Sequence, residues 1–140
     1  MLRSTPFLLF DGNCAEAMTF YKDALGGELT LTRLSETPMK SQFPAEKHDR
    51  IINAHLLSGD LEISATDWMA SPELDPVQGN MSAVFVTSDS DEELRAAFDR
   101  LSSGAGEEWF QPLHEMPFGS YGQFFDRFGV QWIFMGSAAS

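Results

Sequence analysis

The sequence has little cysteine and few basic residues, and it has no long hydrophobic run. One cysteine among 140 residues excludes an intrachain disulfide and a thiolate metal cluster. Nine basic residues against 21 acidic ones give a formal net charge of −12, which repels nucleic-acid phosphates and anionic lipid. The apolar stretch near the start is too short for a signal sequence, and no run approaches the length of a membrane span. We therefore expect a cytoplasmic protein that binds neither nucleic acid nor membrane.

Apolar and aromatic residues, by contrast, are plentiful. Hydrophobic residues make up 43% of the sequence, with 12 Phe and 3 Trp among them. A chain of this length fits one domain and can bury roughly two thirds of its unfolded surface. Ordinary burial accounts for most aromatic residues, but those in excess of a core often line small-molecule pockets.

Two segments have the apolar spacing of amphipathic helices, Asn13–Leu25 and Ser90–Ser102. Each begins with the spacing of a capping box, in which the Asn or Ser is followed three residues later by Glu16 or Glu93. Glycines follow both segments and end them. The apolar residues of the two helices also match one another at a constant offset, which indicates an internal repeat.

Alternating or apolar runs bounded by turn residues predict the strands. The predicted strands are Thr5–Phe10, Leu29–Leu34, Ile51–Leu57, Leu61–Thr66, Met81–Val86, Glu107–Gln111, Tyr121–Phe125 and Val130–Met135. The order of strand, helix and three strands occurs twice, which predicts an α+β domain of two βαβββ modules. The first module covers about residues 1–66, a linker 67–79, and the second module about 80–136. The alternative is an unrelated α+β fold whose halves resemble each other by accident.

Three stretches are predicted to be long loops, and such loops are usually functional or mobile. They are Ser35–Arg50, Asp67–Gly79 and Pro112–Gly119, and they carry His48, Trp68, Met69, His114, Glu115 and Phe118. We interpret them as candidate lids over a cavity. Solvated connectors are the alternative, especially for the polar first stretch.

Four segments, in the right order, resemble the PhnB-like branch of the glyoxalase/bleomycin-resistance (vicinal oxygen chelate) superfamily. They are FDGNCAEAMTFYKDALGGEL, NAHLLSGDLEISATD, GNMSAVFVTSDSDEELRAAFDRL and PLHEMPFGSYGQFFDRFGVQWIF, which together cover nearly the whole chain apart from Ser35–Arg50. The resemblance implies that each module curls its sheet into a U and that the modules enclose a cavity. It also implies a homodimer and a small-molecule ligand.

The resemblance further implies a metal site in metal-dependent members, with His, Glu or Gln ligands from the first and fourth strands of both modules. In this sequence those positions fall near Pro6, at Glu62 or Ser64, at Asn80 or Met81, and at about Ile133. Only Glu62 is a typical ligand. We therefore expect no cofactor and no metal of the family type, although a divalent metal in an atypical site is a less favoured alternative.

Three polar side chains are candidates for chemistry. His55 lies mid-strand on the same face as Asn53, where it is either a general base or ligand partner, or a half-buried structural histidine. Glu62 follows the turn and lies near His55 across the hairpin, so the two either share a proton or Glu62 points to solvent. His114 lies in a predicted loop that either delivers it to a pocket or leaves it at the surface.

Aromatic residues supply the remaining predicted site. Trp68, Phe118 and Tyr121 are the candidate pocket walls, joined by Asn53 and His55 as polar contacts. The favoured function is a protein that binds a small apolar or aromatic molecule without a metal. The alternatives are a lyase, isomerase or oxygenase that uses His55, Glu62 or His114, and a structural or regulatory dimer without a ligand.

Overall fold

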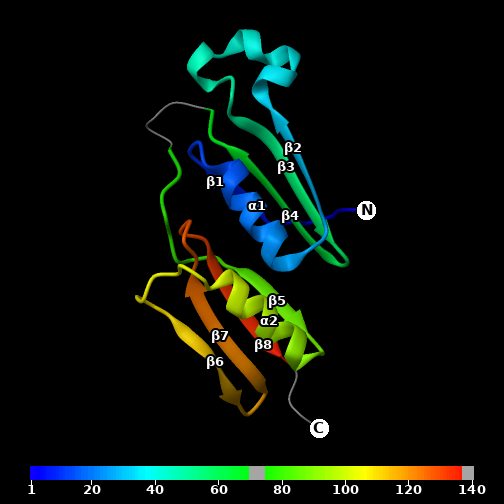
Figure 1. Ribbon diagram of the computed structural model, residues 1–140, viewed down its shortest axis with the longest axis vertical. Coiled ribbons are helices and arrows are strands. Elements are labelled where there is room, and N and C mark those ends of the chain that lie inside the picture. Colours follow the sequence, from blue (N-terminus) through cyan, green and yellow to red (C-terminus); the bar gives the residue numbers. More distant parts are fainter. Residues whose placement is uncertain (70–74, 137–140) are drawn as a thin grey trace. The chain divides into compact units, whose positions relative to one another are not determined.

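The strands form two four-stranded mixed sheets, and one α-helix packs on one face of each sheet (Figure 1). The computed structural model describes residues 1–69 and 75–136. The chain divides into two units, with the boundary between Val77 and Gln78. Unit 1 contains β1 (Phe7–Phe10), α1 (Cys14–Leu25), β2 (Glu28–Arg33), three short 3-10 helices, β3 (Ile51–Ser58) and β4 (Leu61–Asp67). Unit 2 contains β5 (Val84–Ser88), α2 (Asp91–Leu101), β6 (Gln111–Met116), β7 (Gly119–Phe125) and β8 (Gln131–Gly136).

Both sheets have the same strand order. In the first sheet the order is β1-β4-β3-β2, with β1 parallel to β4 and the other neighbours antiparallel. In the second sheet the order is β5-β8-β7-β6, with β5 parallel to β8 and the other neighbours antiparallel. The prediction of an α+β fold made of two βαβββ modules is therefore confirmed.

The apolar face of α1 packs against β2, β3 and β4. Ala17, Met18 and Tyr21 are fully buried on this helix, as the helical spacing predicts. Leu56 of β3 and Ile63 of β4 are equally buried on the helix-covered face of the sheet. Burying a side chain of this size contributes roughly 1.5–3 kcal/mol, so this layer supplies much of the stability of unit 1.

An aromatic cluster forms the core of unit 2. The Phe98 ring of α2 makes edge-to-face contacts with Phe124 and Phe134, with centroids 5.0 and 5.2 Å away. Gly122 of β7 makes room for this ring, since a Cβ there would lie 2.7 Å from Phe98 Cε2. Trp132 of β8 is fully buried on the same face, and Ile133 points to the other face because side chains alternate along a strand.

Ser90 caps the N-terminus of α2 as predicted, although the Glu93 carboxylate accepts from Ser88 and not from the Ser90 amide, and Asn13 does not cap α1. The Ser90 hydroxyl accepts a hydrogen bond from the Glu93 amide at 3.2 Å. Asn13, in contrast, makes no side-chain cap, so the capping box predicted there is wrong. The buried carboxylate of Asp67 takes its place and accepts hydrogen bonds from the amides of Gly12 and Cys14 at 2.8 and 3.0 Å. The cap therefore comes from the end of β4, a tertiary contact that local sequence does not reveal.

The edge strand of unit 2 is also displaced from its predicted place. The predicted strand Glu107–Gln111 and the predicted loop Pro112–Gly119 are both wrong, because β6 spans Gln111–Met116 and β7 begins at Gly119. An edge strand tolerates Pro112 and needs no regular alternation, since only one of its sides pairs and most of its side chains are exposed. Likewise, β5 begins at Val84 and not at Met81.

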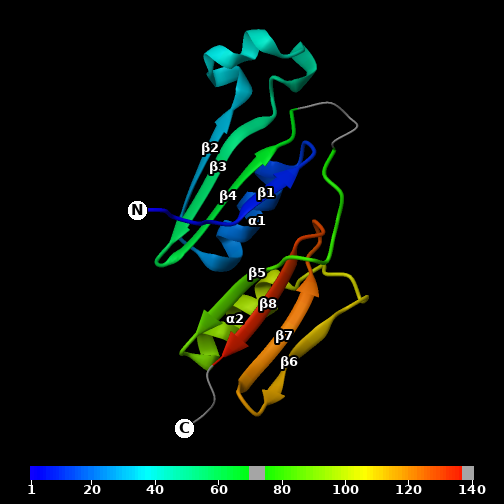
Figure 2. The same cartoon turned by 180° about the vertical axis from the view of Figure 1, so that it is seen from behind.

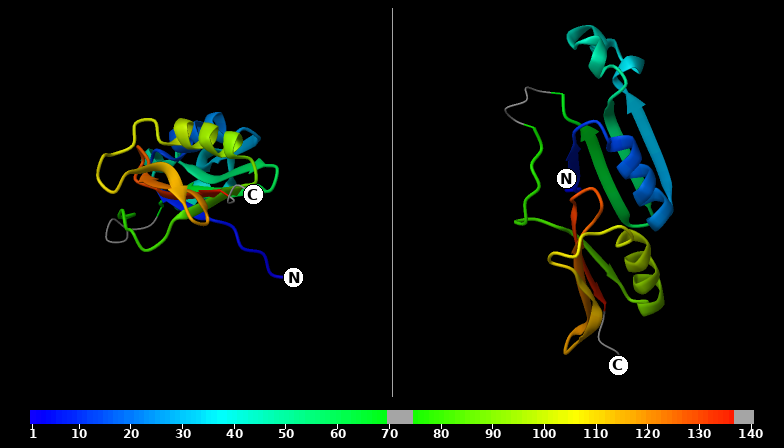
Figure 3. Two further views of the ribbon diagram at one scale, coloured as in Figure 1. Left: turned by 90° about the horizontal axis from the view of Figure 1, so that it is seen from below. Right: turned by 60° about the vertical axis from the view of Figure 1, so that its left-hand side comes forward.

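The predicted loop Ser35–Arg50 is more ordered than expected. It contains η1 (Leu34–Glu36), η2 (Pro38–Gln42) and η3 (Ala45–Lys47), which extend beyond the ends of β2 and β3 in unit 1 (Figure 3). His48 Nε2 hydrogen-bonds to the carbonyls of Lys40 and Phe43 at 2.8 and 3.1 Å. The predicted loop Asp67–Gly79 lies partly outside the described residues.

Within residues 1–69 and 75–136, no helix is both long and apolar enough to cross a membrane.

Candidate functional site

Each sheet has one face that its own helix leaves uncovered (Figure 2). Side chains alternate along a strand, so the neighbours of the buried, helix-facing residues point to this side. The pairing registers define the two faces. The unit 1 open face comprises Phe7, Leu9, Thr30, Thr32, Asn53, His55, Leu57, Glu62, Ser64 and Thr66. The unit 2 open face comprises Phe85, Thr87, His114, Met116, Tyr121, Gln123, Ile133 and Met135.

A polar group crosses the hairpin on the unit 1 open face. His55 pairs with Ser64 and Glu62 pairs with Leu57, so His55 and Glu62 are diagonal neighbours on adjacent strands. His55 Nε2 donates a hydrogen bond to Glu62 Oε1 at 2.9 Å. Arg3 Nη2 donates to the other carboxylate oxygen of Glu62 at 2.8 Å. Of the two predicted orientations of Glu62, the structure therefore has the one that pairs with His55.

This arrangement favours the ionised form of Glu62. The hydrogen bond from His55, followed by the charge of Arg3, holds the pKa of Glu62 below its ordinary value. An ionised Glu62 accepts the Nε2 proton, which makes Nδ1 of a neutral His55 a hydrogen-bond acceptor. No described residue hydrogen-bonds to Nδ1. His55 is part-exposed, so this atom is available to a ligand or to a proton-transfer step.

Asn53 lies on the same face two residues before His55, about 7 Å along the strand. It pairs with Thr32 of β2 and is exposed. Asn53 and His55 therefore present an amide and an imidazole side by side, as predicted, and no direct hydrogen bond joins them.

Three predicted site residues come together on or beside the unit 2 open face. His114 of β6 pairs with Tyr121 of β7, and their ring centroids are 6.1 Å apart. Phe118, in the turn between these strands, meets the Tyr121 ring edge-on at 6.3 Å. The Tyr121 hydroxyl donates to Gln123 Oε1 at 2.8 Å. His114 Nδ1 donates to the Pro112 carbonyl at 2.7 Å.

Trp68 does not belong to either group. It follows the end of β4, where its amide donates to the Phe10 carbonyl and its carbonyl accepts from Arg50 Nη1. Its indole Nε1 is buried and has no hydrogen-bond partner in the described part of the chain. Trp68 and His55 belong to unit 1, whereas His114 belongs to unit 2.

The side chains that stand at the implied metal positions do not fit a metal. The position predicted at Asn80 or Met81 is wrong, because β5 begins only at Val84, and Pro6 lies just before β1. On the open faces, β1, β4, β5 and β8 present Phe7, Ser64, Phe85 and Ile133 at paired positions instead. Three apolar side chains and one hydroxyl cannot replace a set of His, Glu and Gln ligands. Glu62 is engaged by His55 and Arg3. Among the described residues, no group of three or more His, Cys, Asp or Glu side chains is placed to hold a metal.

Two contributors escaped the sequence analysis. Arg3 precedes the first strand, and nothing in its neighbourhood signals that it binds Glu62, 59 positions later. Gln123 fixes the Tyr121 hydroxyl, and it could have been found from the alternation of β7, which places residues 121 and 123 on one face.

The fold and the two open faces define a class of protein built from paired βαβββ modules. The chain belongs to the Glyoxalase/Bleomycin resistance protein/Dioxygenase superfamily, whose model matches residues 3–134. The match spans both units, so neither is an appended foreign domain.

Solved structures and a curated relative agree with this assignment. Protein PA1353 from Pseudomonas aeruginosa is 31% identical over 98% of each chain, with a TM-score of 0.82. Protein YjdN of Escherichia coli is 29% identical over 138 residues, which covers 92% of this chain and 91% of YjdN. The PhnB protein from Bacillus cereus is 21% identical and has a TM-score of 0.71, over 97% of this chain and all of that one. The likeness to the PhnB protein shows a shared fold.

Proposed function

We propose that this protein binds a small apolar or aromatic molecule, without a metal, on its open sheet faces. The observation that best supports ligand binding is the group formed by His114, Phe118 and Tyr121. The Phe118 side chain is 46% exposed and stands edge-on to Tyr121, so both rings present apolar surface. Phe85, 58% exposed on β5, adds apolar area to the same open face. Ordered aromatic surface of this kind is what small-molecule sites use for affinity.

The polar atoms around these rings are already fixed before a ligand arrives. Gln123 holds the Tyr121 hydroxyl, and the Pro112 carbonyl holds His114 Nδ1. If His114 is neutral, this leaves its Nε2 as an acceptor beside the aromatic surface. Groups whose rotamers are set in advance lose less entropy on binding, which favours affinity.

Independence from a metal is supported by the donor chemistry of the implied ligand positions. Phe7, Phe85 and Ile133 supply no lone pair at all, and Ser64 supplies only a hydroxyl. A ligand that meets these side chains is held by apolar contact and not by chelation.

We further propose that the chain forms a homodimer, because burial of the exposed apolar side chains of the open faces against a second copy is favourable. Phe7 is 57% exposed and Leu9 is 42% exposed on unit 1, and Phe85 is similar on unit 2. Contiguous apolar patches on soluble proteins usually mark an interface or a ligand site. Sedimentation equilibrium tests this directly, and a purely monomeric protein at micromolar concentration would contradict it.

The binding function is tested by thermal shift with a panel of uncharged aromatic compounds, 1-naphthol among them. A ligand at about 100 times its Kd should add roughly 2.7 kcal/mol to the unfolding free energy. Tyr121→Ala should weaken binding about tenfold or more, because a buried aromatic contact is lost. Tyr121→Phe is the matched control, since it keeps the ring and removes only the hydroxyl, and it should bind nearly as well as the unaltered protein.

Two results would overturn the proposal. One is equal affinity in Tyr121→Ala, Phe118→Ala and the unaltered protein. The other is a stoichiometric metal in freshly purified, untagged protein, as measured by elemental mass spectrometry.

A second candidate is an enzyme of the lyase, isomerase or oxygenase type, and the hydrogen bond between His55 and Glu62 favours it. A carboxylate that orients a neutral imidazole is a recurrent device for a general base. This alternative with an atypical metal predicts about one equivalent of Ni, Zn, Mn or Fe per chain. The metal should be lost in His55→Ala and Glu62→Ala and retained in His48→Ala, the matched histidine control. If the unaltered protein contains no metal, the version of this alternative with an atypical metal is excluded, and only a metal-free enzyme remains.

A further inference from the structure

Unit 2 contains a hollow that none of the predicted site residues lines. Its volume is about 910 Å³, and its walls are residues 78–80, the loop residues 104, 106, 108 and 109, and the β7–β8 turn at 125–129. This volume lies within the range of small-molecule sites. The hollow is built mainly from chain turns, with Phe125 at the end of β7 as its one strand residue, and its lining does not include Tyr121 or His114.

The turn that forms one wall is held by a buried carboxylate. Asp126 Oδ1 accepts from the amides of Phe128 and Val130 at 2.8 and 3.0 Å. Asp126 Oδ2 accepts from the indole Nε1 of buried Trp132 at 2.9 Å. Charged hydrogen bonds in a buried setting are strong, so this wall is rigid and anchored in the core.

The same turn is tied to the opposite wall. Arg127 donates from Nε and Nη2 to the Ser103 carbonyl and from Nη2 to the Ser103 hydroxyl, at 3.1, 2.9 and 2.6 Å. Gly104 allows this approach, because its φ is +78° and a Cβ there would lie 2.9 Å from Arg127 Nε. The third wall is tied to β8, where Gln131 Nε2 donates to the Asn80 carbonyl at 3.5 Å and to the carbonyl of the nearby Ser82 at 2.7 Å. The hollow is therefore preformed.

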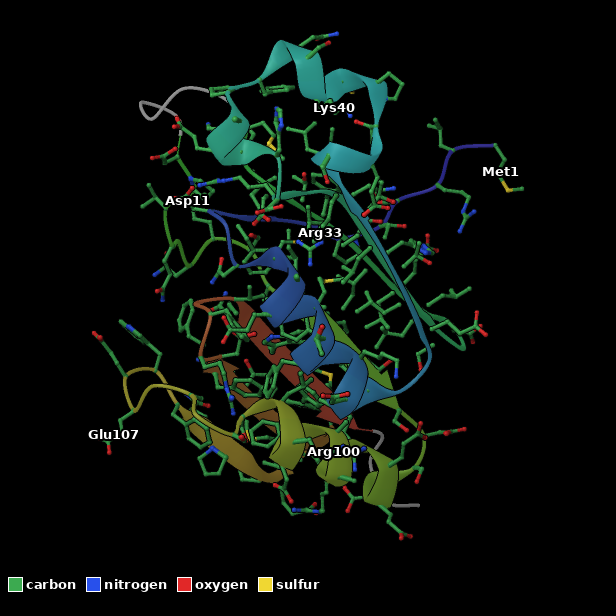
Figure 4. All side chains as sticks on the ribbon, turned by 45° about the horizontal axis from the view of Figure 1, so that its top comes forward. Met1, Asp11, Arg33, Lys40, Arg100 and Glu107 are labelled. Atoms are coloured by element: carbon green, nitrogen blue, oxygen red, sulfur yellow. The ribbon has the colours of Figure 1, made fainter. Side chains whose placement is uncertain are left out.

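Trp109, at the edge of the hollow, combines two unfavourable features. It is the single non-glycine residue with a positive φ among the described residues, at 64°, and its side chain is 63% exposed. The loop that carries it projects from the unit near the labelled Glu107 (Figure 4). Phe110 packs into the core against Phe98 and Phe124, which anchors the end of the loop. Such backbone outliers concentrate at ligand clamps and functional sites.

We propose that this hollow is a second small-molecule site, in which Trp109 stacks on a planar aromatic ligand that is neutral or cationic. The positive φ and the exposed side chain of Trp109 are then explained, because together they present the indole for stacking. Glu108 lines the hollow, and the net charge of the chain is −12, so an anionic ligand is disfavoured. Arg127 and Asp126 also line the hollow, but Arg127 Nε and Nη2 already donate to Ser103, and the Asp126 carboxylate adds a second negative charge.

The test uses adenosine, the proflavine cation and adenosine 5′-monophosphate as probes, with affinities measured by saturation-transfer NMR titration. Adenosine and proflavine should bind saturably. Adenosine 5′-monophosphate, which differs from adenosine only by its charged phosphate, should bind several-fold more weakly. Trp109→Gly should weaken binding of adenosine about tenfold or more, since stacking on the indole is lost.

Trp109→Gly is chosen because glycine adopts a positive φ without strain, so the variant should fold at least as well as the unaltered protein. Met39→Ala is the control, because it removes an exposed apolar side chain of η2 in unit 1 that belongs neither to the hollow nor to an open sheet face, and it should leave adenosine binding unchanged. Unchanged adenosine affinity in Trp109→Gly would overturn the second site. So would the absence of saturable binding by both adenosine and proflavine, or equal affinity for the monophosphate.

Discussion

Replacement of Asp67 by alanine should destabilise the protein far more than replacement of Asn13, although Asn13 occupies the N-cap position of α1. The Asp67 carboxylate accepts three backbone hydrogen bonds, from Gly12, Cys14 and Ile51, at 2.8, 3.0 and 2.9 Å. It thereby joins the start of α1 to the start of β3. The Asn13 side chain makes no cap hydrogen bond at all.

The magnitudes follow from these contacts. In Asp67→Ala the amides of Cys14 and Ile51 are left buried without an acceptor, at roughly 1–3 kcal/mol each. The Gly12 amide is only part-buried and adds less. We expect a loss of about 4 kcal/mol, which places Asp67→Ala among the severe point mutations. Asn13→Ala should cost only a few tenths, whereas a true N-cap would cost about 1 kcal/mol.

Urea unfolding followed by far-UV circular dichroism measures both changes, as shifts in midpoint at a constant slope. Asp67→Asn is an informative third variant, because its one remaining oxygen can serve Gly12 and Cys14 but not Ile51. Its loss should lie between the other two. A cost of about 1 kcal/mol or more for Asn13→Ala, with less than that for Asp67→Ala, would refute the assignment of Asp67 as the cap.

Three further predictions concern other residues. Burial raises the pKa of Cys14 from 9.0 to about 12. The contribution of its thiol to the free energy of unfolding is therefore full below pH 9 and falls by about 1.4 kcal/mol by pH 10. Urea unfolding at pH 8 and pH 10 should show that Cys14→Ala loses less unfolding free energy over this interval than the unaltered protein. Gly122→Ala should cost about 1–3 kcal/mol, since its Cβ would meet the Phe98 ring at 2.7 Å; an unchanged urea midpoint would contradict this. The hydrogen bond from His55 lowers the pKa of Glu62 from 4.5. The stabilisation of the fold by ionised Glu62 is therefore full above pH 4.5 and disappears as the pH falls through the lowered pKa. The difference in melting temperature between the unaltered protein and Glu62→Gln should shrink in acid, and a difference that stays constant would contradict the pairing of His55 with Glu62.

The candidate site shows which contacts a sequence predicts before the pairing register of the strands is known. Alternation alone places Asn53 and His55 on one face of β3, and it brings Glu62 near them across a tight turn. Whether Glu62 points to His55 or to solvent depends on the pairing of Leu57 with Glu62, and on Arg3 from the chain start. Neither follows from a local pattern, so both orientations stayed open until the fold was known.

The displaced strand in unit 2 has a different cause. Central strands are easier to predict because the side chains on their covered face are apolar, as in Gly119–Phe125 and Gln131–Gly136. An edge strand whose side chains are mostly exposed is not destabilised by polar residues or by Pro112, so its sequence resembles that of a loop. The same effect hid the pairing of His114 with Tyr121, which carries the proposed binding function.

The sequence by itself determined the elements whose burial is dictated by their own residues. The two helices, the central strands and the repeated βαβββ order follow from apolar spacing and turn residues, since each element must bury one face. The tertiary structure alone decided which distant groups meet: Asp67 at the start of α1, Arg3 at Glu62, and the turns around Trp109. Such contacts depend on strand register and chain reversal, which bring together residues that carry no mutual signal along the chain.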